Sequence, residues 1–202
     1  MEGPSTSRNS LAAALVFLLA LFSYSTTLVV RAETRFNTEF IRTSCSKTTY
    51  PRLCFSSLSR HASLIQTSPK LLAGAALNGT LDATRSTSGM MLKLSRTLGM
   101  TARQIGAMKD CVEELADSVE ELRRSIAEMS RLRRTSDFGL VMNDIETWVS
   151  AALTDETTCS DGFAGKAMNS KVKNAVRGQI LTVAHLTSNA LALINRFAAL
   201  NG

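Results

Sequence analysis

Apolar residues recur at steps of three and four positions through most of the chain. From 101 to 130 they form one continuous stripe, which is the pattern of an amphipathic helix: Ile105, Met108, Cys111, Val112, Leu115, Val119, Leu122, Ile126 and Met129. The same pattern returns over 137–153, and a wide apolar face runs over 168–199. Residues 70–98 also indicate a helix, although three glycines lower the helix propensity there. The pattern predicts four long helices.

The turns between these segments predict how the helices are arranged. Thr135, Ser136 and Asp137 are good N-cap residues, and arginines between 131 and 134 suit the end of the preceding helix. A short turn near residue 135 sets the second and third helices antiparallel, and residues 161–165 are expected to form the next loop. We predict an all-α fold: an up-down-up-down four-helix bundle over 69–202, preceded by a smaller helical hairpin over 33–68.

Composition supports this fold class. The chain has 202 residues, of which 45% are hydrophobic and 20% charged, so it can bury a substantial core and is not expected to be disordered. None of its three prolines follows Pro69, and only 5% of residues are aromatic, which favours long helices over strands. The net charge of +6 suggests an anionic surface or nucleic acid as partner, but the excess is too small to decide.

The first residues resemble a secretory signal. Arg8 precedes an apolar run over 11–22, which is shorter than the roughly 20 residues of a membrane-spanning helix. Small or apolar residues at 30–32 predict cleavage after Ala32, with residues 23–25 as an alternative cleavage site and an uncleaved anchor as an alternative interpretation. We expect a signal peptide over 1–32, a secreted domain over 33–202, no membrane contact after cleavage and no nucleic-acid partner.

If the chain is secreted, its four cysteines are expected to form disulfides, because an oxidising compartment favours them. Antiparallel partners lie at equal distances from their turn. The midpoint of Cys111 and Cys159 is residue 135, and that of Cys45 and Cys54 falls at the corner near 49–51. Of the three pairings that four cysteines allow, this symmetry favours Cys45 with Cys54 and Cys111 with Cys159.

Motifs of catalysis or metal binding are missing from the sequence. It has no G-x-S-x-G, P-loop, H-E-x-x-H or C-x-x-C, and its two histidines, His61 and His185, are isolated. We therefore expect no enzyme activity, no metal and no cofactor. Asn78-Gly79-Thr80 matches the sequon for N-glycosylation, which marks Asn78 as a candidate glycosylation site.

One acidic stripe remains as a candidate surface. Glu113, Asp117 and Glu120 lie at i, i+4 and i+7, which places them in one column on the predicted helix. The simpler interpretation is a solvated face, whose repulsion is offset by nearby arginines. The alternative is a contact with a basic partner.

Five blocks of sequence resemble the plant invertase and pectin methylesterase inhibitor domain. They are residues 40–54, 110–115, 147–153, 158–163 and 186–192, and together the resemblance covers roughly 36–200. It implies a secreted, non-enzymatic inhibitor in the apoplast or cell wall, with a four-helix bundle, an N-terminal hairpin and two sequential disulfides. Aligned on the cysteines, the family's contact positions fall on Glu113, Asp117, Glu120, Thr158 and Asp161.

Two targets compete within this family. Invertase inhibitors typically carry Pro-Lys-Phe between the third and fourth cysteines, whereas this chain has Arg134-Thr135-Ser136-Asp137-Phe138 and no proline there. The resemblance therefore favours 1:1 inhibition of pectin methylesterase, by covering its active-site cleft, over inhibition of invertase. The positive net charge of the chain suggests weak contact with anionic pectin. A pro-region of pectin methylesterase and a helical lipid carrier are two further interpretations of the chain.

Overall fold

A computed structural model describes residues 15, 17, 33–96, 101–132, 137–164 and 170–201. Nearly all of the predicted signal peptide lies outside the described residues, as do residues 133–136 of the predicted turn. In the part that is described, no helix has the length and apolar character that a membrane span requires.

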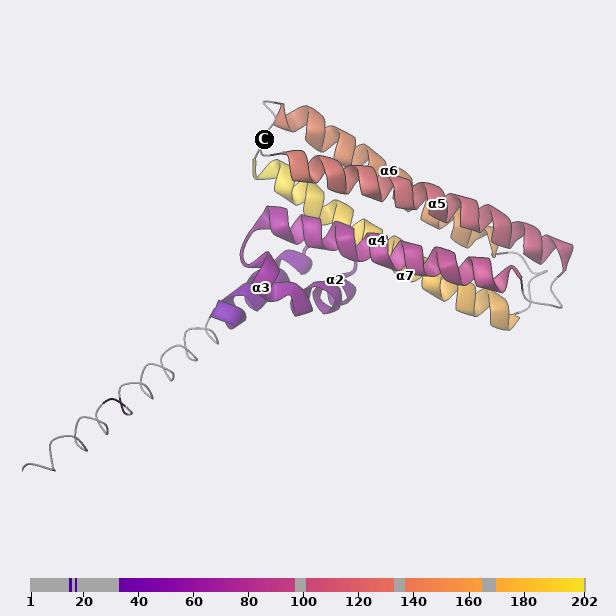
Figure 1. The fold of residues 1–202 in the computed structure, drawn as a ribbon, viewed down its shortest axis with the longest axis horizontal. Helices are drawn as coiled ribbons and strands as arrows, with labels where there is room; N and C mark the ends of the chain where they lie inside the picture. The colour runs from indigo at the N-terminus through magenta and orange to yellow at the C-terminus, as the bar shows by residue number, and fades with distance from the viewer. Residues whose placement is uncertain are drawn as a thin grey trace, which may run out of the picture.

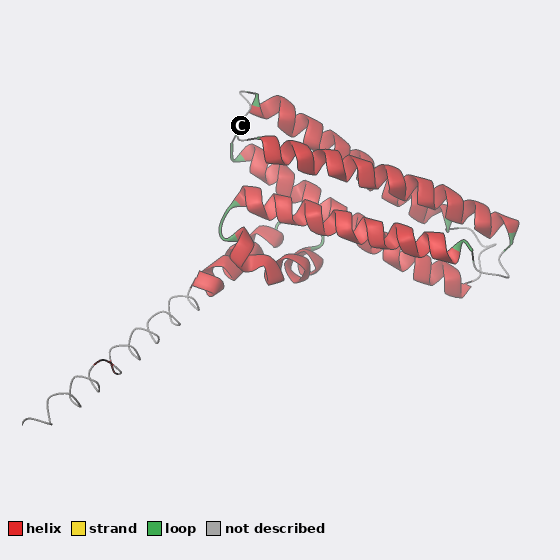
Figure 2. Cartoon of the chain, in the orientation of Figure 1, coloured by secondary structure: helices red, strands yellow, loops and turns green. Residues whose placement is uncertain are grey.

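Four long helices form an elongated bundle (Figure 1). They are α4 (Pro69–Leu94), α5 (Ala102–Arg131), α6 (Phe138–Gly162) and α7 (Ser170–Ala199). α4 packs against α5 and α7, and α6 packs against the same two helices. Figure 2 shows helices joined by loops, with no strand among the described residues. The predicted four-helix bundle is confirmed.

Side-chain caps begin three of these helices. The Ser68 side chain accepts a hydrogen bond from the Leu71 amide, and Pro69 follows at the first helical position. Thr101 and Gln104 form a reciprocal capping box at the start of α5. Asp137 caps α6 by accepting from the Leu140 amide, as its position in the sequence predicts.

Two predicted helix ends are wrong. α6 continues to Gly162, so residues 161 and 162 are helical and not part of the loop. The buried face of α6 continues past Leu153 through Glu156 and Cys159. The apolar pattern in the sequence fades there because one of these core positions holds a glutamate, which is not an apolar residue. α4 ends earlier than predicted, at Leu94, and residues 95 and 96 form a turn.

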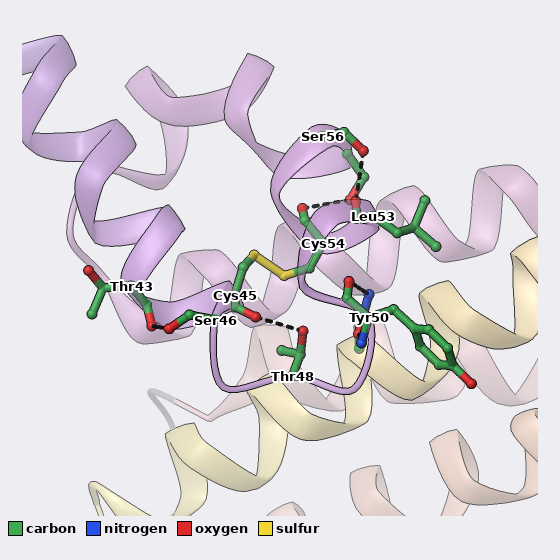
Figure 3. The surroundings of a disulfide bond; sticks show 10 residues. Thr43, Cys45, Ser46, Thr48, Tyr50, Leu53, Cys54 and Ser56 are labelled. Atoms are coloured by element: carbon green, nitrogen blue, oxygen red, sulfur yellow. Dashed lines mark hydrogen bonds between the residues drawn. A yellow bond between two sulfur atoms is a disulfide. The ribbon is translucent and has the colours of Figure 1, made fainter.

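The N-terminal hairpin lies against one end of the bundle, where α4 begins and α7 ends (Figure 1). It consists of helical residues 33–45, α2 (Pro51–Leu58), the short 3-10 helix η1 (Ser59–His61) and α3 (Ala62–Ile65). The disulfide between Cys45 and Cys54 closes its corner (Figure 3).

One asparagine attaches this corner to the bundle. Asn189 of α7 accepts from the Tyr50 amide and donates to the Tyr50 carbonyl, both at 3.0 Å. The Tyr50 ring stacks on His185, also of α7, with ring centroids 3.6 Å apart. Because Asn189 is buried, losing these two bonds would leave its side-chain amide without these partners. The hairpin corner is therefore fixed by polar contacts as well as by packing.

The core consists of two apolar clusters with a polar layer between them. The cluster nearer the hairpin includes Leu77, Leu122, Ile145 and Ile194, and the cluster at the other end includes Met91, Leu115, Phe163 and Ile180. Between them the four long helices contribute buried polar side chains, which include Thr84, Ser118, Glu156 and Thr187.

Glu156 is the centre of this polar layer. Its Oε1 accepts hydrogen bonds from Ser118 Oγ at 2.9 Å and Thr84 Oγ1 at 3.5 Å. Burial raises the pKa of Glu156 to about 7, against the hydrogen bonds from Thr187, Ser118 and Thr84, which lower it. The bundle therefore holds a carboxyl group that favours its neutral form.

Candidate functional site

A disulfide joins α5 to α6 at the end of the bundle far from the hairpin. Cys111 and Cys159 are bonded, with their Cα atoms 4.4 Å apart, and both are buried. This is the sequential pairing that the symmetry of the turn predicts. It links residues 48 positions apart in the sequence, so the surface next to it is assembled from two rigid helices.

All five residues that the sequence marks for partner binding are exposed, and Glu120 lies farthest from the disulfide along the chain, nine positions after Cys111. Glu113, Asp117 and Glu120 are on α5, and Thr158 and Asp161 are on α6. Thr158 lines a hollow of ≈ 580 Å³ between the two helices, whereas the other four are not among its lining residues. The structure thus places the five on the exposed faces of α5 and α6 without gathering them into one pocket.

Glu120 already has a partner on its own helix. Its Oε1 lies 3.3 Å from Nε of Arg124, one turn further along α5, and both side chains are largely exposed. Exposed pairs at this spacing stabilise a helix by only about 0.3–0.5 kcal/mol. The contact offsets repulsion within the acidic column and leaves Glu120 accessible.

The structure also reveals acidic residues that the sequence analysis missed. Glu114 and Glu121 of α5 each form a side-chain hydrogen bond with Asp155 of α6, and Asp117 lies close enough to raise the pKa of all three. We call Glu114, Asp117, Glu121 and Asp155 the carboxyl cluster. It lies along the seam between the two helices, next to the predicted residues.

Three members of the carboxyl cluster, Glu114, Glu121 and Asp155, have raised pKa values and so hold their protons more readily than ordinary carboxyl groups. Burial, followed by the charge of Asp155, raises the pKa of Glu121 to about 7. Burial is also the main cause that raises the pKa of Asp155 and of Glu114. Two carboxyl groups can hydrogen-bond only when one of them is protonated, so the pair of Glu121 and Asp155 shares a proton in acidic solution.

A signal for this cluster was present in the sequence. Reflection through residue 135, which pairs the cysteines, also places Asp155 opposite residue 115, beside Glu114. Glu114, Asp117 and Glu121 follow steps of three and four, just as Glu113, Asp117 and Glu120 do. The two columns share Asp117, and spacing alone does not say which of them faces α6.

The arrangement suits recognition better than reaction. Across the described ranges, no group of three or more His, Cys, Asp or Glu residues is placed to hold a metal ion. What the site offers is exposed carboxylates and a hydroxyl on two helices that a disulfide holds together. Such a surface can form charge-assisted hydrogen bonds with a basic partner.

Comparison with known proteins gives this surface a context. A family model described as plant invertase/pectin methylesterase inhibitor matches residues 39–193. The "21 kDa protein" of Daucus carota is 48% identical over 163 residues, which cover 80% of this chain and 84% of that protein. "Pectinesterase inhibitor 11" of Arabidopsis thaliana is 44% identical over 162 residues, which cover 79% and 80% respectively.

The fold of the chain is also similar to that of a solved pectin methylesterase inhibitor. A crystal structure of a mutant pectin methylesterase inhibitor from Arabidopsis superposes with a TM-score of 0.60, at 22% identity, over 75% of this chain and 92% of that one. The family match, the two relatives and the helical bundle agree. The chain belongs to the plant invertase/pectin methylesterase inhibitor family.

Proposed function

We propose that the chain is a secreted inhibitor of pectin methylesterase. In this proposal the disulfide-linked end of α5 and α6 docks over the active-site cleft of the enzyme in a 1:1 complex and excludes pectin. Relatives named pectinesterase inhibitors, two of them 44% and 41% identical to this chain, support this target. The inhibitor performs no chemistry of its own.

The observation that carries the proposal is the exposed polar surface beside Cys111 and Cys159. Glu113 and Asp117 on α5 and Thr158 on α6 are presented from rigid helices that are joined covalently. A rigid surface loses little conformational freedom on binding, so more of the interaction energy appears as affinity. Carboxylates at the contact suit basic or hydrogen-bond-donating groups at the rim of the cleft.

The carboxyl cluster extends the same surface. Glu114 lines the hollow that Thr158 also lines, and Asp155 bonds to Glu114 and Glu121. When these groups are neutral they can donate as well as accept hydrogen bonds, and when they are charged they repel one another. Affinity is therefore expected to change between acidic and neutral pH and to fall with added salt.

Secretion is part of the proposal. The N-terminal pattern of a basic residue, an apolar run and small residues supports a signal peptide over 1–32 and a mature domain over 33–202. Two disulfides suit an oxidising compartment outside the cytosol. The apoplast and cell wall are then the place where the chain meets its target.

Invertase is the second target that the family name includes. The stretch between Cys111 and Cys159 contains no proline, so it cannot carry the Pro-Lys-Phe motif that the resemblance associates with invertase inhibitors. This departure favours pectin methylesterase. An invertase therefore serves as the comparison enzyme in any inhibition assay.

The proposal is tested with a variant of the α5 surface. Glu113→Ala/Asp117→Ala removes two exposed carboxylates, and each hydrogen bond to a charged group is worth about 1.5–3 kcal/mol. We expect the concentration for half-inhibition of a purified plant pectin methylesterase to rise by about tenfold or more. Inhibition curves for the two proteins give this ratio.

The matched control is Glu39→Ala, which removes an exposed acid from the hairpin end. It should inhibit as strongly as the unaltered chain, and circular dichroism should show all three proteins equally helical. Equal potency of Glu113→Ala/Asp117→Ala and the unaltered chain would remove these residues from the contact surface.

A further inference from the structure

A second hollow lies between the hairpin and the bundle. It has a volume of ≈ 340 Å³, and its walls come from α2, η1 and α3 on one side and from α4 and α7 on the other. This volume falls within the range of about 300–1,000 Å³ that small-molecule sites occupy. Its lining is largely apolar, and Leu64 and Leu71 in it are 72% and 44% exposed. Two large apolar side chains thus face solvent at the junction of the two parts of the molecule.

Asn78 lies on the wall of this hollow. It is two turns along α4 from Leu71 and one turn from Ala75, so the three share one face of the helix. Its Nδ2 donates to the Gly74 carbonyl at 2.8 Å, which shows that the amide points back along α4 toward Leu71. The exposed sequon asparagine is therefore directed along the wall of the hollow.

The space around this amide is open. A Cβ atom built on Gly74 or Gly79 would meet nothing within 4 Å, and Gly79 also lines the hollow. Glycine in a helix interior costs about 1 kcal/mol relative to alanine, yet packing with the described residues requires no glycine at either position. The face of α4 that carries Asn78 has room for a bulky group.

We propose that Asn78 carries an N-linked glycan whose first N-acetylglucosamine units lie in this hollow, over Gly74 and against Leu64 and Leu71. This inference rests on the proposed secretion of the chain. The Nδ2 atom bonds to C1 of the first sugar, the bond between C1 and the oxygen of a lipid pyrophosphate carrier breaks, and one amide proton leaves. The second amide hydrogen stays available to the Gly74 carbonyl.

The buried sequon threonine sets the order of events. Thr80 is 1% exposed, and its Oγ1 donates to the Ala76 carbonyl at 2.9 Å. The enzyme that transfers the glycan cannot contact this hydroxyl once α4 has packed into the bundle. The sugar must therefore be added before the bundle folds. The chain then folds with the sugar already on the wall of the hollow.

The chemistry of the hollow matches a sugar attached there. The C–H faces of a pyranose ring pack on apolar side chains such as Leu64 and Leu71, which removes their surface from water. His61 and Asp82 also line the hollow and offer polar partners for hydroxyl and acetamido groups. Because Leu64 belongs to α3 and Leu71 to α4, a sugar against both holds the hairpin to the bundle.

The test begins with the full chain secreted from cells that make only high-mannose glycans. Intact mass is expected to show one glycan, which Asn78→Gln abolishes. The glycosylated protein, and the protein trimmed by endoglycosidase H to a single N-acetylglucosamine, should unfold about 3 °C or more above Asn78→Gln. Nuclear Overhauser effects should connect the acetyl methyl of the first sugar with methyl groups of Leu64 and Leu71.

The control moves the glycan elsewhere. Arg123→Asn in the Asn78→Gln background creates Asn-Arg-Ser on the exposed face of α5, again with a buried hydroxyl residue, Ser125, in third place. This glycan should not raise the unfolding temperature. Absence of a glycan on Asn78 would overturn the inference. So would a glycan on Asn78 that does not contact Leu64 and Leu71 and gives an unfolding temperature no higher than that of the protein with the glycan at position 123. A secreted chain that inhibits pectin methylesterase without this glycan leaves the proposed function standing.

Discussion

Glu156 places a carboxyl group at the centre of the bundle, where the other three long helices each supply a hydroxyl. Its pKa is about 7 in the folded chain, compared with 4.5 for an ordinary glutamate. Below pH 4.5 both the folded and unfolded chains hold the proton. As the pH rises toward 7 the unfolded chain releases it while the folded chain keeps it, so the free energy of unfolding falls across this window.

The Glu156→Gln variant tests this effect. A difference of about 2.5 pKa units, at about 1.4 kcal/mol each, gives a loss of roughly 3 kcal/mol between pH 4.5 and 7. Glutamine cannot ionise, so the variant should lose less stability than the unaltered chain over that range. Chemical denaturation at several pH values measures the difference.

Part of the pH dependence should remain in this variant. The raised pKa values of Glu114, Glu121 and Asp155 act in the same direction as that of Glu156. The exposed Glu39→Gln serves as the control and should change the slope little. Parallel stability curves for Glu156→Gln and the unaltered chain would show that Glu156 does not cause this pH dependence.

At the scale of elements, two disulfides close loops of very different length. Cys45 and Cys54 are 9 positions apart within the hairpin, whereas Cys111 and Cys159 are 48 positions apart and join two long helices. In the chain-entropy model a crosslink stabilises more when its loop is longer, and the two loops correspond to about 2.7 and 4 kcal/mol. The helix-to-helix disulfide should therefore contribute more to stability.

Removing each pair of cysteines separates the two contributions. Urea denaturation of Cys111→Ala/Cys159→Ala and Cys45→Ala/Cys54→Ala should show the larger loss in the first variant, by about 1 kcal/mol. The first variant should also inhibit less well, because it frees the surface that the inhibitor is proposed to use. A larger loss in the hairpin variant would mean that loop length does not decide the ranking.

The arrangement of elements could be predicted from the sequence largely because of periodicity and caps. The stripe over 101–130 predicts α5 almost to its ends, and Asp137 marks the start of α6. The end of α6 could not be predicted in the same way, because the buried Glu156 breaks the apolar pattern while remaining in the core. A polar core residue becomes recognisable only when its partners on other helices are known.

At the scale of the whole molecule, the two ends of the bundle have different roles in our proposals. The hairpin end carries Asn78 and its hollow, while the other end carries the disulfide and the acidic surface. A net charge of +6 leaves acids in the minority, so their grouping on α5 and α6 stands out against a basic background that can attract anionic pectin weakly.

Only part of the candidate site could be predicted from the sequence. The exposure of Glu113, Asp117 and Glu120 follows from their spacing against the apolar stripe. The resemblance to the family, rather than spacing, indicated Thr158 and Asp161. The contact of Asp155 with Glu114 and Glu121 depends on the rotation of α5 against α6, which no local pattern records.

The central claim is that this chain inhibits pectin methylesterase by occupying it one to one. The most direct measurement is a titration of a fixed amount of purified plant pectin methylesterase with the refolded chain at acidic pH, alongside an identical titration of a plant invertase. We predict that esterase activity falls steadily and reaches its minimum at one chain per enzyme, while invertase activity is unchanged. Full esterase activity in the presence of a molar excess of the chain would contradict the account.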